Sequence, residues 1–189
     1  MKNAPPNYER TVDPTTEPLT TAEAKTQLRE SSSDFDTQID ELVKAARAMV
    51  ETRTGRGLVD QTWKATLNAF PDGDEIPLSH GPIQSITSVT YLDADENRQT
   101  FSSSSYTLDK FGRGFVSLNE SANWATGITE QAGSIEVIFV TGYGSASTDI
   151  PSDLLSAIRL HVEDLYCGEN QHKTREQAIR SLITPYIVR

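Results

Sequence analysis

The chain has 189 residues, a net charge of −10, a hydrophobic fraction of 36% and a single cysteine. One cysteine rules out an intramolecular disulfide framework and a cysteine-based zinc finger, and the longest apolar run, residues 137–140, is far shorter than the roughly 20 residues that cross a bilayer. The excess of carboxylates repels nucleic-acid phosphates, so sequence-independent DNA binding is not expected either.

The first 18 residues contain four prolines and few apolar side chains. Such a segment buries too little surface to offset the entropy lost on ordering, so residues 1–18 are predicted to form a flexible N-terminal leader. The first dozen residues also lack the apolar stretch of a secretory signal, which predicts a protein made in a reducing compartment.

Two helices are predicted over residues 19–58, as the N-terminal half of a helical bundle. Thr20 and Glu23 have the spacing of a capping box, which predicts a short helix over about residues 21–29. Apolar residues then recur at steps of three and four across residues 35–50, which predicts a long helix with one buried face.

Opposite charges four residues apart lie outside this apolar stripe. Arg47 and Glu51 form one such pair, and Asp40 and Lys44 form another. The spacing predicts weak pairs, each worth about 0.2–0.5 kcal/mol, on the solvent-facing side of the long helix.

Between residues 59 and 146 the apolar period changes from helical to alternating, which predicts an inserted antiparallel β lobe. The predicted strands lie at residues 62–67, 88–92, 98–101, 106–109, 115–118 and 134–141. We expect Trp63, Tyr91 and Phe139 to be substantially buried in this lobe.

Helical spacing returns over residues 147–183, the C-terminal half of the bundle. Pro151 suits the first helical position, and an apolar stripe from Leu154 to Tyr166 predicts a long helix after it. A shorter helix is predicted over about residues 174–183. The order of elements predicts an α+β fold: a small bundle of about four helices with an inserted antiparallel β lobe.

The sequence offers little for catalysis or for metal and cofactor binding. His161, Cys167 and His172 are close in sequence but lack an evident fourth ligand for zinc, and His161 is predicted to be a partly buried structural histidine. Glu163 and Asp164 are adjacent on a helix and predict a solvated face rather than a catalytic pair. No cofactor, no metal and no enzymatic activity are therefore expected.

Charge is distributed unevenly along the chain. Residues 60–169 carry 5 basic and 16 acidic side chains, whereas residues 170–189 carry 4 basic and 1 acidic. A basic, apolar end suits docking to an acidic protein surface or to a neighbouring copy. Extended from residue 183, a docking tail at 184–189 could reach about 23 Å from the body, although it could also fold back onto its own core. The residues predicted to make this contact are Arg180, Leu182, Ile183, Pro185, Tyr186, Ile187, Val188 and Arg189.

A series of short motifs follows one another through most of the chain. They lie at residues 19–29, 45–47, 50–56, 61–63, 76–78, 82–83, 85–93, 141–144, 150–151 and 182–186. Together they resemble the head–tail connector (adaptor, or neck) proteins of tailed bacteriophages, over about residues 19–187. Residues 167–169, Cys-Gly-Glu, depart from the family pattern, which has an Arg-Glu pair after the helix.

The resemblance implies a non-enzymatic structural protein of the virion neck, present in the host cytoplasm during assembly. It implies a ring, a dodecamer, that lies under the portal protein, extends the DNA channel and contacts a downstream neck or tail protein, a stopper or tail terminator. The C-terminal segment would dock onto the portal. Genomic DNA would pass through the acidic channel without specific binding, and no membrane contact is implied.

Two alternatives stay open at this point. The chain could be a different phage neck or tail-completion protein that binds on the tail side, which its position in purified necks would reveal. It could also be a small metal-dependent hydrolase that uses His161, Cys167 and His172.

Overall fold

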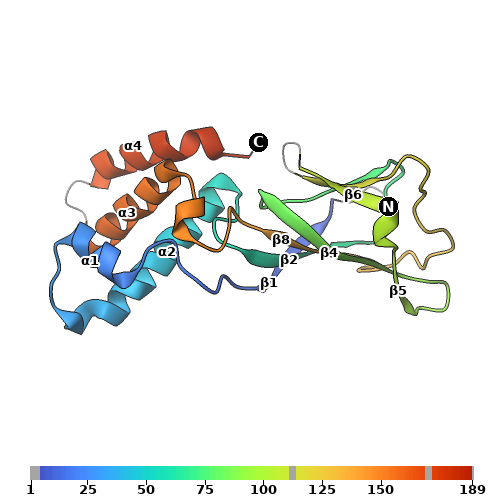
Figure 1. Ribbon diagram of the computed structural model, residues 1–189, viewed down its shortest axis with the longest axis horizontal. Helices are drawn as coiled ribbons and strands as arrows, with labels where there is room; N and C mark the ends of the chain where they lie inside the picture. The colour runs from blue at the N-terminus through green and yellow to red at the C-terminus, as the bar shows by residue number, and fades with distance from the viewer. Residues whose placement is uncertain (1–4, 111–113, 169–171, 189) are drawn as a thin grey trace. The chain divides into compact units, whose positions relative to one another are not determined.

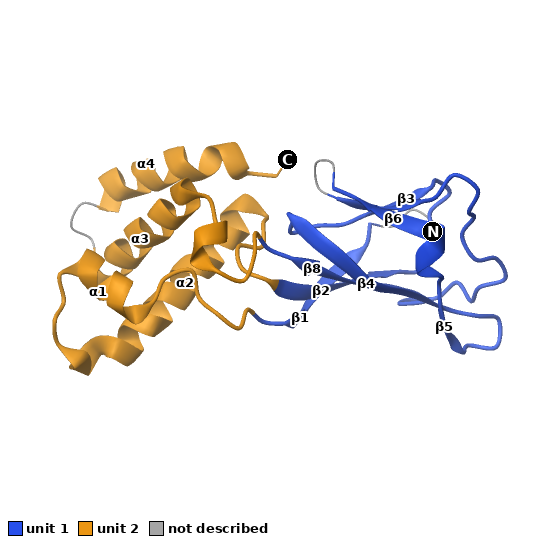
Figure 2. Ribbon diagram, viewed as in Figure 1, with its two compact units in different colours: residues 1–13, 61–142 blue, residues 14–60, 143–189 orange. Residues whose placement is uncertain are grey.

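The computed structural model describes residues 5–110, 114–168 and 172–188. They form two compact units, each built from segments that are distant in the sequence (Figures 1 and 2). The β unit comprises Met1–Asp13 and Gln61–Gly142, and the helical unit comprises Pro14–Asp60 and Tyr143–Arg189. In the sequence, the longer segment of the β unit is thus inserted between the two halves of the helical unit.

The helical unit is a small bundle. Its described elements are α1 (Thr21–Leu28), η1 (Ser33–Phe35), α2 (Asp36–Thr54), η3 (Ser147–Asp149), α3 (Ser152–Cys167), α4 (His172–Ile183) and η4 (Thr184–Tyr186), where η marks a short 3-10 turn. The predicted capping box is present, because Thr20 Oγ1 accepts from the Glu23 N–H at 3.2 Å and the Glu23 carboxylate accepts from the Thr20 N–H at 2.8 Å. The four predicted helices correspond to α1, α2, α3 and α4, so each of them is confirmed.

The buried faces of the helices share one core. Its fully buried side chains at helical spacing are Ile39, Val43, Ala46 and Val50 of α2, Leu154, Ala157, Ile158 and Val162 of α3, and Ile179 of α4. Burying apolar area is the main stabilising term for such a bundle, at about 25 cal/mol per Å².

Arg47 and Glu51 of α2 belong to a buried ion cluster, with residue exposures of 7% and 8%. Arg47 Nη1 donates to Glu51 Oε2 at 2.9 Å, and Arg47 Nε donates to Glu17 Oε2 at 2.8 Å. Glu51 Oε1 also accepts from the Leu58 N–H at 3.0 Å. The prediction of a solvent-facing pair is wrong because Glu17, 30 residues before Arg47, and the chain after α2 cover this side of the helix.

The β unit contains two antiparallel sheets, with strand orders β1-β2-β8-β4-β5 and β3-β7-β6. The strands are β1 (Asn7–Val12), β2 (Gln61–Leu67), β3 (Glu75–Pro77), β4 (Ile83–Leu92), β5 (Arg98–Thr100), β6 (Tyr106–Asp109), β7 (Phe115–Leu118) and β8 (Ile135–Thr141). All predicted strand segments are present, and β1 and β3 are additional.

Both sheets contribute to one core within the β unit, including Ile76, Val116, Val89 and Val137. Phe139 is fully buried there, as predicted. Trp63 and Tyr91 pack against the same core but remain partly exposed, so the prediction of substantial burial holds fully only for Phe139.

The N-terminal segment includes a strand of the larger sheet. β1 lies antiparallel to β2, with Tyr8 opposite Ala65, and the Tyr8 hydroxyl donates to the Pro77 carbonyl at 2.8 Å. The prediction that residues 1–18 form a flexible leader is wrong for this segment, because pairing with a sheet edge orders a backbone that buries few side chains of its own. Residues 1–4 lie outside the described residues.

The fold is α+β: a bundle of helices with an antiparallel β lobe inserted in the sequence, as predicted. Across the described residues, the helices are all too short or too polar to span a membrane.

Candidate docking surface

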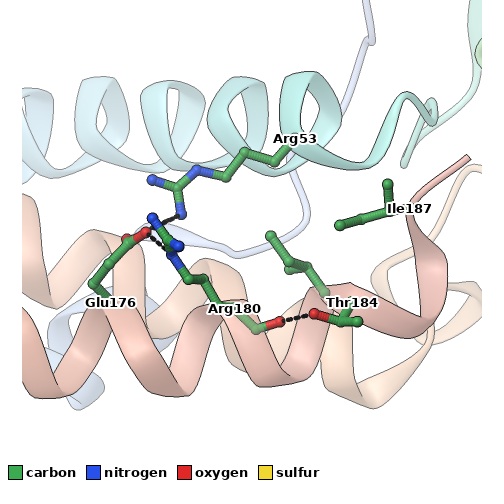
Figure 3. A pocket seen from close by; sticks show the side chains of 6 residues that line it. Arg53, Glu176, Arg180, Thr184 and Ile187 are labelled. Atoms are coloured by element: carbon green, nitrogen blue, oxygen red, sulfur yellow. Dashed lines mark hydrogen bonds and ion pairs between the residues drawn. The ribbon is translucent and has the colours of Figure 1, made fainter. Parts of the chain in front are cut away.

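The predicted interaction residues lie on α4, on η4 and in the residues that follow. Three of them, Arg180, Ile183 and Ile187, line one open pocket of about 390 Å³ (Figure 3). We call this surface the C-terminal pocket, and its lining residues are Arg53, Glu176, Arg180, Ile183, Thr184 and Ile187. α2 supplies Arg53, and α4 with the turn after it supplies the rest.

Glu176 lies between two arginines in this pocket. Arg53 Nη1 donates to its two carboxylate oxygens at 3.0 and 3.1 Å, and Arg180 Nε donates to Oε1 at 2.9 Å (Figure 3). The hydrogen bond from Arg180 is the main reason why the pKa of Glu176 lies below its ordinary value, and Arg53 lowers it further. The Arg180 side chain is still 74% exposed, so its guanidinium is accessible to an acidic group of another protein.

Residues 184–188 fold back onto the helical unit. The Val188 N–H donates to the Thr54 carbonyl at 2.9 Å, and Arg56 Nε donates to the Tyr186 carbonyl at 2.6 Å. The prediction of an extended tail is wrong, because the unpaired carbonyls at the C-terminal end of α2 offer hydrogen-bond acceptors to the chain itself. The alternative, a tail folded onto its own unit, is the one observed.

Burial divides the predicted residues into groups. Ile183 is buried, Leu182, Tyr186 and Val188 are half-buried, and Arg180, Pro185 and Ile187 are exposed. The buried and half-buried side chains hold the tail in place, whereas the exposed ones form the accessible surface. Ile187 is 43% exposed and is the most exposed apolar side chain that lines the C-terminal pocket. Arg189 lies outside the described residues.

Arg53, Glu176 and Thr184 line the pocket but were not among the predicted interaction residues. Glu176 and Arg180 are four residues apart on a predicted helix, and that spacing was a usable signal for their ion pair. No local pattern pairs Arg53 with Glu176, because the two residues are 123 positions apart and meet only when α2 packs near α4.

The basic residues near the C-terminus are partly neutralised within the helical unit. Arg175 Nη2 donates to Glu163 Oε1 at 3.0 Å, and its Nη1 lies 3.8 Å from Asp164 Oδ1. The prediction of a solvated Glu163–Asp164 face is wrong, since both carboxylates tie α3 to α4. Among the described residues of this segment, Lys173 and Arg180 carry the exposed positive charge.

The three candidate metal ligands are not assembled into a site. His161 is 1% exposed within the helical core, as predicted for a structural histidine, whereas Cys167 is exposed. His172 Nδ1 lies 2.7 Å from Asp164 Oδ2. Within the part of the chain that the structure describes, no three His, Cys, Asp or Glu side chains are placed to hold a metal ion.

Solved structures provide the comparison, because no family model and no curated protein matches the chain. A chain in the neck of an empty gene transfer agent (GTA) particle, computed with C6 symmetry, has a TM-score of 0.77 and 19% identity, over 97% of this chain and 96% of that chain. A chain in the virion of a native GTA particle has a TM-score of 0.79 and 20% identity, over 96% and 95%. This chain has the fold of GTA neck and virion chains.

A third similar chain comes from the neck of a native GTA particle, computed with C12 symmetry. Its TM-score is 0.71 at 20% identity, over 95% of this chain and 96% of that chain. Both units take part in these matches, since each covers nearly the whole of both chains.

Proposed function

We propose that this chain is a structural head–tail connector, an adaptor that forms a ring under the portal protein of a phage-like particle. The observation that carries the proposal is the match of 95–97% of the chain to chains of GTA necks and virions. In this role the protein extends the DNA channel and joins head to tail as part of the virion neck. It acts as a structural component rather than as an enzyme.

The proposed ring contains twelve copies. The similar neck structures were computed with C6 and with C12 symmetry, and a ring of twelve identical subunits satisfies both. A net charge of −10 on each copy repels the DNA backbone, which lets the genome pass without specific binding.

The C-terminal pocket is the proposed contact with the portal. Arg180 offers an exposed guanidinium, and Ile187 offers exposed apolar surface in the same pocket. Pro185, on the turn that precedes Ile187, is exposed as well. Such a surface suits an acidic patch that has an apolar residue at its centre. A downstream stopper or tail terminator is the second proposed partner.

Substituting two exposed pocket residues tests this contact without unfolding the tail. Arg180→Glu combined with Ile187→Asp should reduce co-sedimentation with the cognate portal by more than about tenfold, because charge and apolar contact are both lost. A deletion of the tail is less informative, since it also removes the Val188–Thr54 bond.

The matched control is Lys173→Glu combined with Leu165→Asp, an exposed cation and an exposed apolar residue outside the pocket. It should leave portal binding unchanged, and circular dichroism should show both variants folded. Undiminished binding of the pocket variant would contradict the portal contact. Electron microscopy of necks that contain a tagged chain shows where this protein lies in the neck. A tag found only on the tail side would indicate another neck or tail-completion protein.

A further inference from the structure

Two arginines of the helical unit line one pocket without being neutralised there. Arg29 directly follows α1 and Arg159 lies on α3, and they share this pocket with Glu23, Thr26 and Gln27. We call these five residues the arginine pocket. Neither guanidinium makes an ion pair or a side-chain hydrogen bond with the residues that the structure describes.

This pair is unusual within the chain. The protein has 27 acidic and 17 basic residues, and the other arginines that the structure describes in the helical unit each make a hydrogen bond or an ion pair. Three of them form an ion pair with a carboxylate: Arg47 with Glu17 at 2.8 Å, Arg53 with Glu176 at 3.0 Å and Arg175 with Glu163 at 3.0 Å. Arg29 and Arg159 therefore lack a bound carboxylate among the described residues, although the chain has more acidic than basic side chains.

The one carboxylate in the pocket already accepts two hydrogen bonds through one of its oxygens. Glu23 accepts from the backbone N–H and from the hydroxyl of Thr20, both at 2.8 Å, as part of the capping box. These hydrogen bonds lower the pKa of Glu23, and the charge of Arg159 contributes only a minor part of the shift. The two guanidinium groups therefore keep their donor forks available, and such forks bind carboxylates in bidentate fashion.

The β unit presents an acidic segment at residues 72–75, which we call the acidic loop and which ends on the first residue of β3. Asp72, Asp74 and Glu75 are exposed, and none has an ion pair among the described residues. The loop is held by its backbone: Trp124 Nε1 donates to the Gly73 carbonyl at 2.8 Å, and a strand residue donates to the Asp74 carbonyl at 2.9 Å. Its carboxylates are therefore presented on a fixed backbone, which reduces the entropy lost on binding.

We propose that the arginine pocket of one copy binds the acidic loop of the next copy in the ring. Arg29 and Arg159 would pair with the carboxylates of Asp72 and Asp74. The two surfaces are different, so every copy donates one and accepts one, and such a head-to-tail contact builds a ring when its rotation closes. This inference rests on the proposed function, since it concerns the contact between neighbours in that ring.

Reversing the charges tests the contact. Arg29→Glu with Arg159→Glu should reduce the yield of rings on the cognate portal by more than about tenfold, and so should Asp72→Lys with Asp74→Lys, because like charges then face each other. An equimolar mixture of the two variants should restore the rings. When the two variants alternate, one contact joins the wild-type pocket to the wild-type loop, and the next joins the glutamate pocket to the lysine loop, so opposite charges meet at every contact. Ring yield is counted by negative-stain microscopy and by mass photometry.

Two control variants carry the same changes in charge elsewhere. Lys44→Glu with Lys173→Glu and Asp95→Lys with Glu96→Lys alter exposed residues outside both surfaces and should assemble as the wild type does. Two results would overturn this contact and leave the proposed function standing, provided that the wild type forms rings. Both reversed variants could assemble normally, or the mixture of the two folded variants could fail to restore rings. Failure of the wild type to form rings on the portal would overturn the proposed function and the contact with it.

Discussion

Replacing Glu51 with alanine is expected to lower the free energy of unfolding of the helical unit by about 3–5 kcal/mol. The change leaves the buried Arg47 guanidinium with Glu17 as its remaining carboxylate partner in the cluster, and it removes the acceptor of the Leu58 N–H. Burial is the largest influence on the pKa of Arg47 and lowers it, yet Glu17 and Glu51 together raise it above its ordinary value. A guanidinium is not deprotonated in proteins, so the arginine stays charged in the variant. The loss comes from a buried charge that keeps one carboxylate instead of two and from a buried Leu58 N–H that has lost its acceptor.

Urea unfolding followed by far-UV circular dichroism measures this effect, because the helices lie in the helical unit. Both tryptophans, Trp63 and Trp124, lie in the β unit, so their fluorescence reports that unit separately. Glu51→Gln keeps an acceptor for the Leu58 N–H and should lose less stability than the alanine variant. Glu41→Ala, at an exposed position of α2, is the control and should change stability by less than about 0.5 kcal/mol. A loss below about 1 kcal/mol for Glu51→Ala would show that the cluster contributes little.

The helices were predictable because their determinants are local. The capping box of Thr20 and Glu23 and the three-and-four spacing of apolar residues along α2 and α3 lie within single elements. β8 was predictable for a similar reason, since a short apolar run bounded by Gly133 and Gly142 is a local signal of a buried strand.

The features that were mispredicted depend on partners that are distant in sequence. β1 has an exposed side-chain pattern, and its order comes from backbone pairing with β2, whose paired residues lie 50 to 59 positions later. The spacing of Arg47 and Glu51 revealed a pair but not its burial, which Glu17 and Leu58 bring about.

The candidate docking surface shows the same division. The excess of positive charge near the C-terminus indicated Arg180, and the apolar residues after Pro185 indicated Ile187. Both side chains are exposed, and both line the C-terminal pocket. The folded-back tail was not predictable, because it depends on carbonyls freed at the end of α2 and on Arg56, which is 130 positions from Tyr186.

His161→Leu is expected to remove a pH dependence from the stability of the helical unit. The histidine is 1% exposed, and neither ring nitrogen has a hydrogen-bond partner among the described residues. Burial is the main cause that lowers the pKa of His161. The charges of Arg53 and His172 lower it further, and Glu176 and Asp164 act against them. The folded state therefore holds the neutral ring.

The sign follows from proton linkage. Below a pH of about 6.5 the unfolded chain protonates this histidine more readily than the folded chain does, so the wild type loses stability as the pH falls, by up to about 1.4 kcal/mol per pH unit. The leucine variant should lack this part of the slope and should be as stable as the wild type, or more stable, at pH 8, since no hydrogen bond is lost. Urea midpoints from pH 8 to pH 5 measure the difference, above the range in which the carboxylates titrate. Equal slopes in both proteins would show that the folded state protonates His161, and a large loss of stability at pH 8 would show that its ring nitrogens have partners.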